Sequence, residues 1–178
     1  MVYILLADGF EEIEVITPAD IMRRAGIDVK TASISEKTVT GAHGIQITAD
    51  ILISEINPDD AELIMLPGGE GHERLDASND VHAIINYAVT HDLYIAAICA
   101  APSILGKKML LEGKNATCYP GFEKYLYGAN VSPDKAVIDG KIIMGKGPGA
   151  ASEFGFAIVE TLKGKDAAGS LKKAMQYE

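Results

Sequence analysis

Cys99 is the residue whose surroundings in the sequence most favour covalent chemistry. It lies in the stretch AAICAAP, between the apolar run 93–98 and a pattern typical of a helix, with Pro102 in the first turn. A cysteine at a tight strand-to-helix turn has the geometry of a nucleophile elbow, and the free amides of a helix start favour a thiolate. We therefore expect a thiol pKa well below that of a free cysteine. The alternative is a small, buried, unreactive side chain.

Glu14 is the second candidate catalytic residue. It lies in the stretch ADGFEEIEVITPAD, where the first predicted strand passes into a helix. Glu11 and Glu12 are expected to face water in the first turn of that helix, where acids favour its dipole. Glu14 shares its helical face with apolar residues, and a buried carboxyl tends to keep its proton and to donate a hydrogen bond. Such a group beside Cys99 would activate the sulfur, although a structural role for Glu14 is the alternative.

Two glycine-rich loops are predicted at the same edge of the sheet. The stretch LPGG, with Gly68 and Gly69, ends a predicted strand and lets backbone amides approach a ligand closely, as an oxyanion hole requires. The stretch GKGPGA, residues 145–150, fits the dinucleotide pattern only weakly, because no strand that could carry a ribose-binding acid follows its helix. Neither loop is followed by a Walker lysine-serine pair, so we expect no nucleotide and no other cofactor.

Short apolar runs alternate with amphipathic stretches along the chain. The runs predicted as buried parallel strands are residues 2–7, 28–34, 62–67 and 93–98. Helical patterns begin at Asn79, which can act as a cap, at Ser152 and after Asp166. Residues 38–48 and 136–145 are expected to be antiparallel additions. The sequence predicts one domain over residues 1–178: a three-layer α/β sandwich whose mostly parallel, doubly wound sheet binds ligands at the carboxyl ends of its strands.

Composition excludes several classes of function. The 178 residues carry a formal net charge of −9 and no basic run, so nucleic acid and anionic membranes would be poorly attracted. The only cysteines, Cys99 and Cys118, are too few for a disulfide scaffold and lack the spacing of a zinc site. The apolar run 2–7 is too short for the core of a signal peptide and has no basic leader, so we expect a cytoplasmic location.

These motifs together resemble the ThiJ/PfpI superfamily, in its DJ-one and YajL-like branch. The resemblance runs in order from about residue 2 to residue 165 and is carried by EEIE with Glu14, MRRAGI from Met22, LPGG from Leu66, AAICAAP around Cys99 and GPG from Gly147. It implies a flavodoxin-like domain of the class I glutamine amidotransferase-like type, usually assembled as a homodimer. A set of motifs in this order is far more specific than any one of them.

The resemblance also implies roles for individual residues. Cys99 would be an oxidation-prone nucleophile and Glu14 its protonated partner. Gly69 and Ala100 would donate backbone amides to an oxyanion, and Arg24 would lie near the dimer contact.

The implied activities are the cofactor-free conversion of methylglyoxal to lactate and the removal of early glycation adducts from proteins or nucleotides. The implied ligand is therefore a small reactive aldehyde or a glycated adduct. Protease activity belongs to another branch and is not expected. The alternative is a redox-sensing or chaperone-like stress protein that uses Cys99 stoichiometrically, without substantial turnover.

This sequence departs from the family pattern at one place that bears on catalysis. Some members place a histidine beside the cysteine, in a His-Pro pair, whereas the matching stretch here is Cys118-Tyr119-Pro120. The missing histidine favours the redox alternative. His43 stands where an arginine is expected, and Cys118 is expected to be structural, with nothing in its position to suggest an approach to Cys99. The possible accessory residues of the site are His72, Gly68 and Tyr119.

Overall fold

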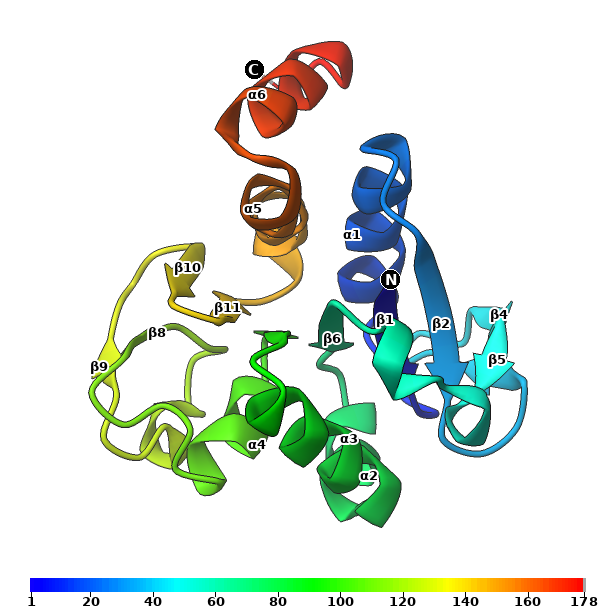
Figure 1. Ribbon diagram of the computed structural model, residues 1–178. Coiled ribbons are helices and arrows are strands. Elements are labelled where there is room, and N and C mark those ends of the chain that lie inside the picture. The colour runs from blue at the N-terminus through cyan, green and yellow to red at the C-terminus, as the bar shows by residue number, and fades with distance from the viewer. Residues whose placement is uncertain (178) are drawn as a thin grey trace.

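The computed structural model describes residues 1–177 and is built around a seven-stranded sheet (Figure 1). The strand order is β10-β11-β7-β6-β1-β2-β5, and only the β10–β11 pair is antiparallel. The strands are β1 (Val2–Leu6), β2 (Val29–Ser33), β5 (Ile51–Leu52), β6 (Leu63–Leu66), β7 (Tyr94–Ile98), β10 (Ala136–Asp139) and β11 (Ile142–Gly145).

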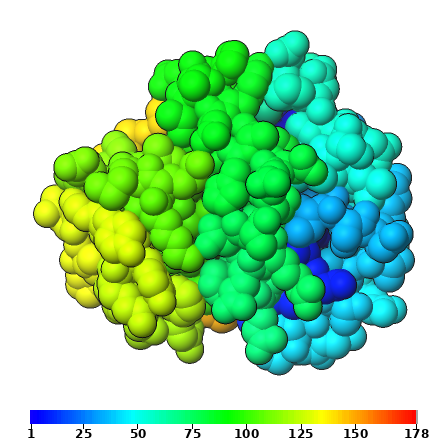
Figure 2. Space-filling model, turned by 90° about the horizontal axis from the view of Figure 1, so that it is seen from below, coloured from blue at the N-terminus to red at the C-terminus, as the bar shows by residue number. Residues whose placement is uncertain are grey.

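Helices cover both faces of this sheet. One face carries α1 (Glu12–Arg24), α5 (Ala151–Lys163) and α6 (Lys165–Ala174). The other carries α2 (Gly71–Ala77), α3 (Asn79–Thr90) and α4 (Pro102–Lys107), which appear in green in the space-filling view (Figure 2). Successive strand residues point to opposite faces, so Leu6 and Ile98 join the core under α1 and α5, while Leu5 and Ala97 join the core over α2 to α4. The predicted three-layer, flavodoxin-like α/β sandwich is confirmed.

The predicted elements match the observed ones with two corrections. The four apolar runs correspond to β1, β2, β6 and β7, and the three helical patterns correspond to α3, α5 and α6. The cap of α3 is Ser78 rather than Asn79, because the Ser78 hydroxyl accepts a hydrogen bond from the Val81 amide at 3.4 Å. Within residues 136–145, only β10 is an antiparallel addition. The fully buried β11 pairs in parallel with β7 inside the sheet.

The remaining elements are short. The predicted hairpin over residues 38–48 is confirmed as β3 (Thr38–Thr40) and β4 (Gln46–Thr48), which form a separate antiparallel pair. A second pair, β8 (Asn115–Ala116) and β9 (Asn130–Val131), is parallel. The 3-10 helices are η1 (Ile53–Glu55), η2 (Pro58–Asp60), η3 (Glu123–Tyr125) and η4 (Pro148–Ala150). No helix within residues 1–177 is long and apolar enough to cross a bilayer.

Candidate active site

Cys99 lies directly after β7, at the carboxyl edge of the sheet, in a strained backbone conformation. Its φ of 66° is in the left-handed region, which residues other than glycine rarely adopt. Two hydrogen bonds hold the residue there. The Cys99 amide donates to the Gly145 carbonyl at 2.9 Å, and the Cys99 carbonyl accepts from the Tyr119 amide at 2.8 Å. The sharp turn expected from the sequence is therefore present and is supported from both sides.

Glu14 projects from α1 toward this turn and is fully buried. Its Oε2 atom accepts a hydrogen bond from the Gly68 amide at 2.9 Å, and a side-chain hydrogen bond joins its carboxyl group to the Cys99 thiol. The Oε1 atom is buried without a hydrogen-bond partner. The amides of Gly69 and Ala100 donate to the Cys99 sulfur. The sulfur, the carboxyl group and the glycine loop thus meet at one point.

Gly68 provides the space in which the sulfur and the carboxyl group meet. A Cβ atom at this position would lie 2.6 Å from Cys99 Cβ, 2.7 Å from Glu14 Oε2 and 3.0 Å from Cys99 Sγ. The loop is tied to the start of α1, because the Glu11 amide donates to the Gly68 carbonyl at 3.2 Å. The two catalytic candidates therefore approach each other over a residue that has no side chain.

Burial dominates the electrostatics of the pair. It raises the pKa of Glu14 to about 7, although the hydrogen bonds with Cys99 and Gly68 oppose the shift. It also raises the pKa of the Cys99 thiol, and a charged Glu14 raises that pKa further, against the opposing effect of the Gly69 and Ala100 amides. The prediction of an acidic thiol is wrong for this geometry. Cys99 is 8% exposed, and α4 has only six residues and begins at Pro102, so its dipole is small.

The two groups titrate as one unit, because they share a hydrogen bond in a buried place. The first proton leaves the pair near pH 7, and the second is retained far into the alkaline range. Above neutral pH a single proton therefore remains between the Glu14 carboxylate and the Cys99 sulfur. A thiolate exists only while that proton is on Glu14.

His72 and Tyr119 lie near the pair without placing a titrating group on the sulfur. His72 is 9% exposed, and its Nδ1 atom lies 2.7 Å from the Gly69 carbonyl oxygen. The Tyr119 side chain is exposed, and its backbone amide donates to the Cys99 carbonyl. Within residues 1–177, the hydrogen-bond partners of the Cys99 sulfur are thus Glu14 and backbone amides.

Cys118 lies in the segment that runs beside Cys99, as the hydrogen bond from the Tyr119 amide to the Cys99 carbonyl shows. The absence of a short approach between the two thiols stays a prediction. The two side chains nevertheless join different cores. Cys99 belongs to the core under α1 and α5, whereas Cys118 belongs to the core over α2 to α4. Burial raises the pKa of Cys118 to about 12, with the charge of Glu123 adding to the shift.

Glu12 has a role that the sequence did not reveal. We expected it to face water, but it is 6% exposed because the turn between β3 and β4 folds over it. Its Oε1 atom accepts from the amides of His43 at 2.8 Å and Ile45 at 3.3 Å, and His43 Nδ1 lies 3.0 Å from its Oε2 atom. Glu12 therefore anchors the hairpin to the start of the helix that carries Glu14.

Replacing Glu12 with glutamine is expected to flatten the acid side of the stability profile. Burial alone would raise the pKa of Glu12, but hydrogen bonds from the His43 ring and from backbone amides outweigh it and lower the pKa overall. A carboxyl group with a lowered folded-state pKa stabilises the fold above its unfolded-state pKa, and the contribution is lost as the pH falls through the folded-state value. Urea unfolding between pH 7 and pH 3 should show a smaller acid loss in Glu12→Gln than in the wild type. Equal acid losses would contradict the anchoring role.

Arg24 lies on the exposed side of α1, away from the reactive pair. Its Nε atom forms an ion pair with Asp20 Oδ2 at 2.7 Å, one helical turn earlier. Nothing in a single chain tests its placement at a dimer contact, which stays a prediction.

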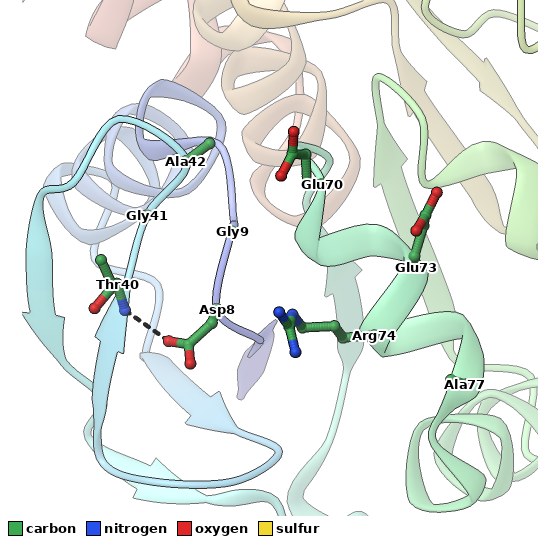
Figure 3. A pocket seen from close by; sticks show the side chains of 9 residues that line it. All are labelled: Asp8, Gly9, Thr40, Gly41, Ala42, Glu70, Glu73, Arg74 and Ala77. Carbon is green, nitrogen blue, oxygen red and sulfur yellow. Dashed lines mark hydrogen bonds between the residues drawn. The ribbon is translucent and has the colours of Figure 1, made fainter.

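A cleft of about 650 Å³ lies between the loop after β1, the β3–β4 hairpin and α2 (Figure 3). The Thr40 amide donates to Asp8 Oδ1 at 2.9 Å on one of its walls. Its lining residues offer carboxylates and a guanidinium group but no nucleophile, so we assign no chemistry to it. They are Asp8, Gly9, Thr40, Gly41, Ala42, Glu70, Glu73, Arg74 and Ala77.

Comparison with known proteins finds likeness along most of the chain. The model of the DJ-1/PfpI family matches residues 1–161. Protein DJ-1 homolog B of Arabidopsis thaliana is 42% identical over 171 residues, which are 94% of this chain and 39% of that protein, so the chain spans about two fifths of the length of this relative. The glutathione-independent glyoxalase DJR-1.2 of Caenorhabditis elegans is 32% identical over 97% of this chain and 93% of its own. A deglycase of Pyrococcus abyssi is 32% identical over 91% of this chain and 99% of its own.

Solved structures agree with the fold over almost the whole chain. The crystal structure of Drosophila melanogaster DJ-1beta superposes with a TM-score of 0.91 at 34% identity, covering 98% of this chain and 96% of that one. A cysteine-to-alanine mutant of a DJ-1 superfamily protein from Salmonella typhimurium gives a TM-score of 0.93 at 31% identity, covering 99% and 98%. The strands and helices that position Cys99 and Glu14 therefore follow an arrangement already seen in crystals.

Proposed function

The chain belongs to the DJ-1/PfpI family, and from this premise we propose that it is a cofactor-free enzyme that converts small reactive carbonyl compounds with Cys99 and Glu14. Relatives named as a glyoxalase and a deglycase support activity of this general type. The proposed substrates are 2-oxoaldehydes such as methylglyoxal, which would be converted to lactate, or early glycation adducts of proteins or nucleotides.

The observation that carries this proposal is the state of the Glu14 carboxyl group. Its Oε2 atom is held by the Gly68 amide, while Oε1 is buried without a hydrogen-bond partner. An unpaired buried oxygen destabilises a fold, so its presence needs a reason outside stability. A substrate oxygen or a migrating proton at Cys99 would supply the missing partner.

The chemistry follows from the single proton of the pair. With that proton on Glu14, the Cys99 thiolate adds to the aldehyde carbon of the substrate, a C–S bond forms, and the carbonyl electron pair moves to oxygen. Glu14 gives its proton to this oxygen, and the amides of Gly69 and Ala100, which donate to the Cys99 sulfur, stabilise the charge while it develops. The product of this step is a hemithioacetal.

Proton transfer and hydrolysis complete the cycle. The Glu14 carboxylate removes the proton from C1 of the hemithioacetal, and the electron pair of that bond forms a C1–C2 double bond while the C2 carbonyl oxygen takes up a proton, which gives an enediol. Glu14 then returns its proton to C2, the C1 hydroxyl group loses its proton as the C1 carbonyl forms, and the product is a thioester of the 2-hydroxy acid. Water then hydrolyses the thioester, releasing the hydroxy acid and restoring the Cys99 thiol. One water is consumed for each aldehyde, and no external oxidant or reductant is needed, because the oxidation at C1 balances the reduction at C2.

Turnover of methylglyoxal tests the proposal directly. The purified wild-type protein should release many equivalents of lactate per subunit, whereas Cys99→Ala should release none above the uncatalysed rate because no nucleophile remains. Cys118→Ala is the matched control and should keep its turnover, since Cys118 lies in the opposite core. Lactate formation by Cys99→Ala at the wild-type rate would overturn the proposal.

The same assay tests a second candidate function, in which Cys99 is modified without turnover. Tyr119 occupies the place of the family's histidine, so Cys99 has no imidazole partner within residues 1–177. A thiol without that partner is suited to a redox sensor or chaperone-like protein that is modified once. One modification per subunit with no continued lactate release would favour that function.

A further inference from the structure

A second cleft, of about 520 Å³, lies between α2, α4 and η3. It is on the face of the sheet opposite α1, where the green helices border the yellow-green segment that follows α4 (Figure 2). Neither Cys99 nor Glu14 lines it. The cleft is therefore separate from the reactive pair, and its lining has to be explained on other grounds.

Ser103 is the most informative residue of this cleft. It lies on α4, is 1% exposed and is one of the residues that line the cleft, and its hydroxyl group is buried without a hydrogen-bond partner. Burying a hydroxyl group without a partner is unfavourable, and alanine would avoid the cost while favouring the helix. The hydroxyl group is therefore suited to a ligand that supplies the missing hydrogen bond.

His72 offers the complementary group. Its Nδ1 atom lies 2.7 Å from the Gly69 carbonyl oxygen, which can only accept, so the ring proton is on Nδ1. With that proton on Nδ1, the Nε2 atom can accept a hydrogen bond, and it has none within residues 1–177. Ser103 as a donor and His72 as an acceptor are together the pair of groups that one ligand hydroxyl requires.

The charged side chains that line the cleft determine the charge that its ligand can carry. Lys107 is paired with Asp76 at 2.6 Å, but Lys124 has no carboxylate within ion-pair distance in the part of the chain that the structure describes. Its ammonium group lies 5.0 Å from the ring centroid of Tyr125. Lys124 is thus available to one anionic group, while the carboxylates of Glu73 and Asp76 oppose a second negative charge.

We propose that this cleft binds a small hydroxycarboxylate with a single negative charge. The carboxylate pairs with Lys124, the hydroxyl group bonds Ser103 and His72, and the short carbon chain lies against the ring of Phe122, which already makes an edge contact with His72. His72 also links the cleft to the reactive pair, because the Gly69 residue that it holds donates its amide to the Cys99 sulfur. Hydroxycarboxylates are the product class of the proposed reaction, although binding here does not require turnover.

Titration with L-lactate tests the site. Binding should be saturable when followed by amide NMR shifts or calorimetry, and Ser103→Ala and Lys124→Met should each weaken it about tenfold, as expected for the loss of a hydrogen bond or ion pair to a charged ligand. Ser54→Ala and Lys163→Met, at exposed positions outside the cleft, are the matched controls and should bind as the wild type does. Inorganic phosphate does not carry only a single negative charge, and glycerol carries none. Each should therefore bind at least tenfold more weakly than L-lactate.

The stability of ligand-free Ser103→Ala provides a second and independent readout. Its urea midpoint should equal or exceed that of the wild type, because an unpaired hydroxyl is removed. A lower midpoint would mean that the hydroxyl already has a partner and would overturn the proposal, as would the absence of saturable lactate binding or equal binding of phosphate. Because these measurements need no turnover, their failure is distinguishable from a failure of the proposed enzyme activity.

Discussion

Methylglyoxal turnover by Glu14→Gln is expected to fall about 10²- to 10⁴-fold, the range typical of a lost general acid or base. Glutamine can keep the hydrogen bond from the Gly68 amide, because its carbonyl oxygen replaces Oε2. It cannot give up or take a proton, so it can neither protonate the oxyanion nor move the proton from C1 to C2. The measurement is lactate release under saturating substrate, with Glu112→Gln, at an exposed position, as the matched control.

Thiol labelling against pH separates this chemical role from a structural one. Iodoacetamide labelling of wild-type Cys99 should have its midpoint in the alkaline range, because burial and the charged Glu14 carboxylate both raise the pKa of the thiol. In Glu14→Gln the burial remains but the carboxylate charge is gone, so the labelling midpoint should move in the acidic direction. Wild-type turnover in the variant, or an unchanged labelling curve, would remove Glu14 from the mechanism.

Unfolding of Glu14→Gln does not offer an alternative explanation for the loss. The folded wild type holds a proton on Glu14 up to a pKa of about 7, whereas the unfolded chain releases it near 4.5, so wild-type stability falls as the pH rises through this interval. Glutamine removes that penalty. At pH 8 the urea midpoint of the variant should therefore be no lower than that of the wild type.

Local sequence patterns predicted the strands well because the central ones are buried on both faces. The runs that became β1, β6 and β7 are nearly continuous in apolar residues, which is the pattern of a parallel strand between two helix layers. The error at β11 has a clear cause. The Asp139-Gly140 turn predicts an antiparallel hairpin correctly, but the parallel partner of β11 is β7, a pairing between segments far apart in the sequence.

The sequence predicted which residues form the site, but not the direction in which the pKa of its thiol is shifted. Cys99, Glu14 and Gly68 each follow a strand or begin a helix at the same edge, so their meeting follows from the topology. The raised pKa of the thiol depends on how completely other segments cover it, which no local pattern records. The burial of Glu12 was likewise not predictable, because it depends on a hairpin about thirty residues away, to which His43 belongs. The same holds for the unpaired hydroxyl group of Ser103.

Alanine at position 68 is expected to reduce turnover about a hundredfold, a loss typical of reacting groups displaced by about 1 Å. The added Cβ would lie 2.6 Å from Cys99 Cβ and 2.7 Å from Glu14 Oε2, closer than such atoms can approach. Gly68 does not have a left-handed φ, so the substitution acts through this contact and not through backbone strain. The Cys99 turn is held by Gly145 and Tyr119, so the Glu14 carboxyl group is the part that must move away.

The helix glycine Gly169 supplies the matched control for this prediction. A Cβ there would meet no atom within 4 Å, and alanine favours a helix, so Gly169→Ala should keep full turnover and equal or greater stability. Measurements of kcat/KM and of the pH midpoint of Cys99 labelling in both variants connect the activity to the geometry. With Glu14 displaced, its charge raises the thiol pKa less, so the labelling midpoint of Gly68→Ala should move in the acidic direction, as in Glu14→Gln. If Gly68→Ala instead turns over at the wild-type rate with an unshifted midpoint, then close approach of the carboxyl group to the sulfur is not what activates Cys99.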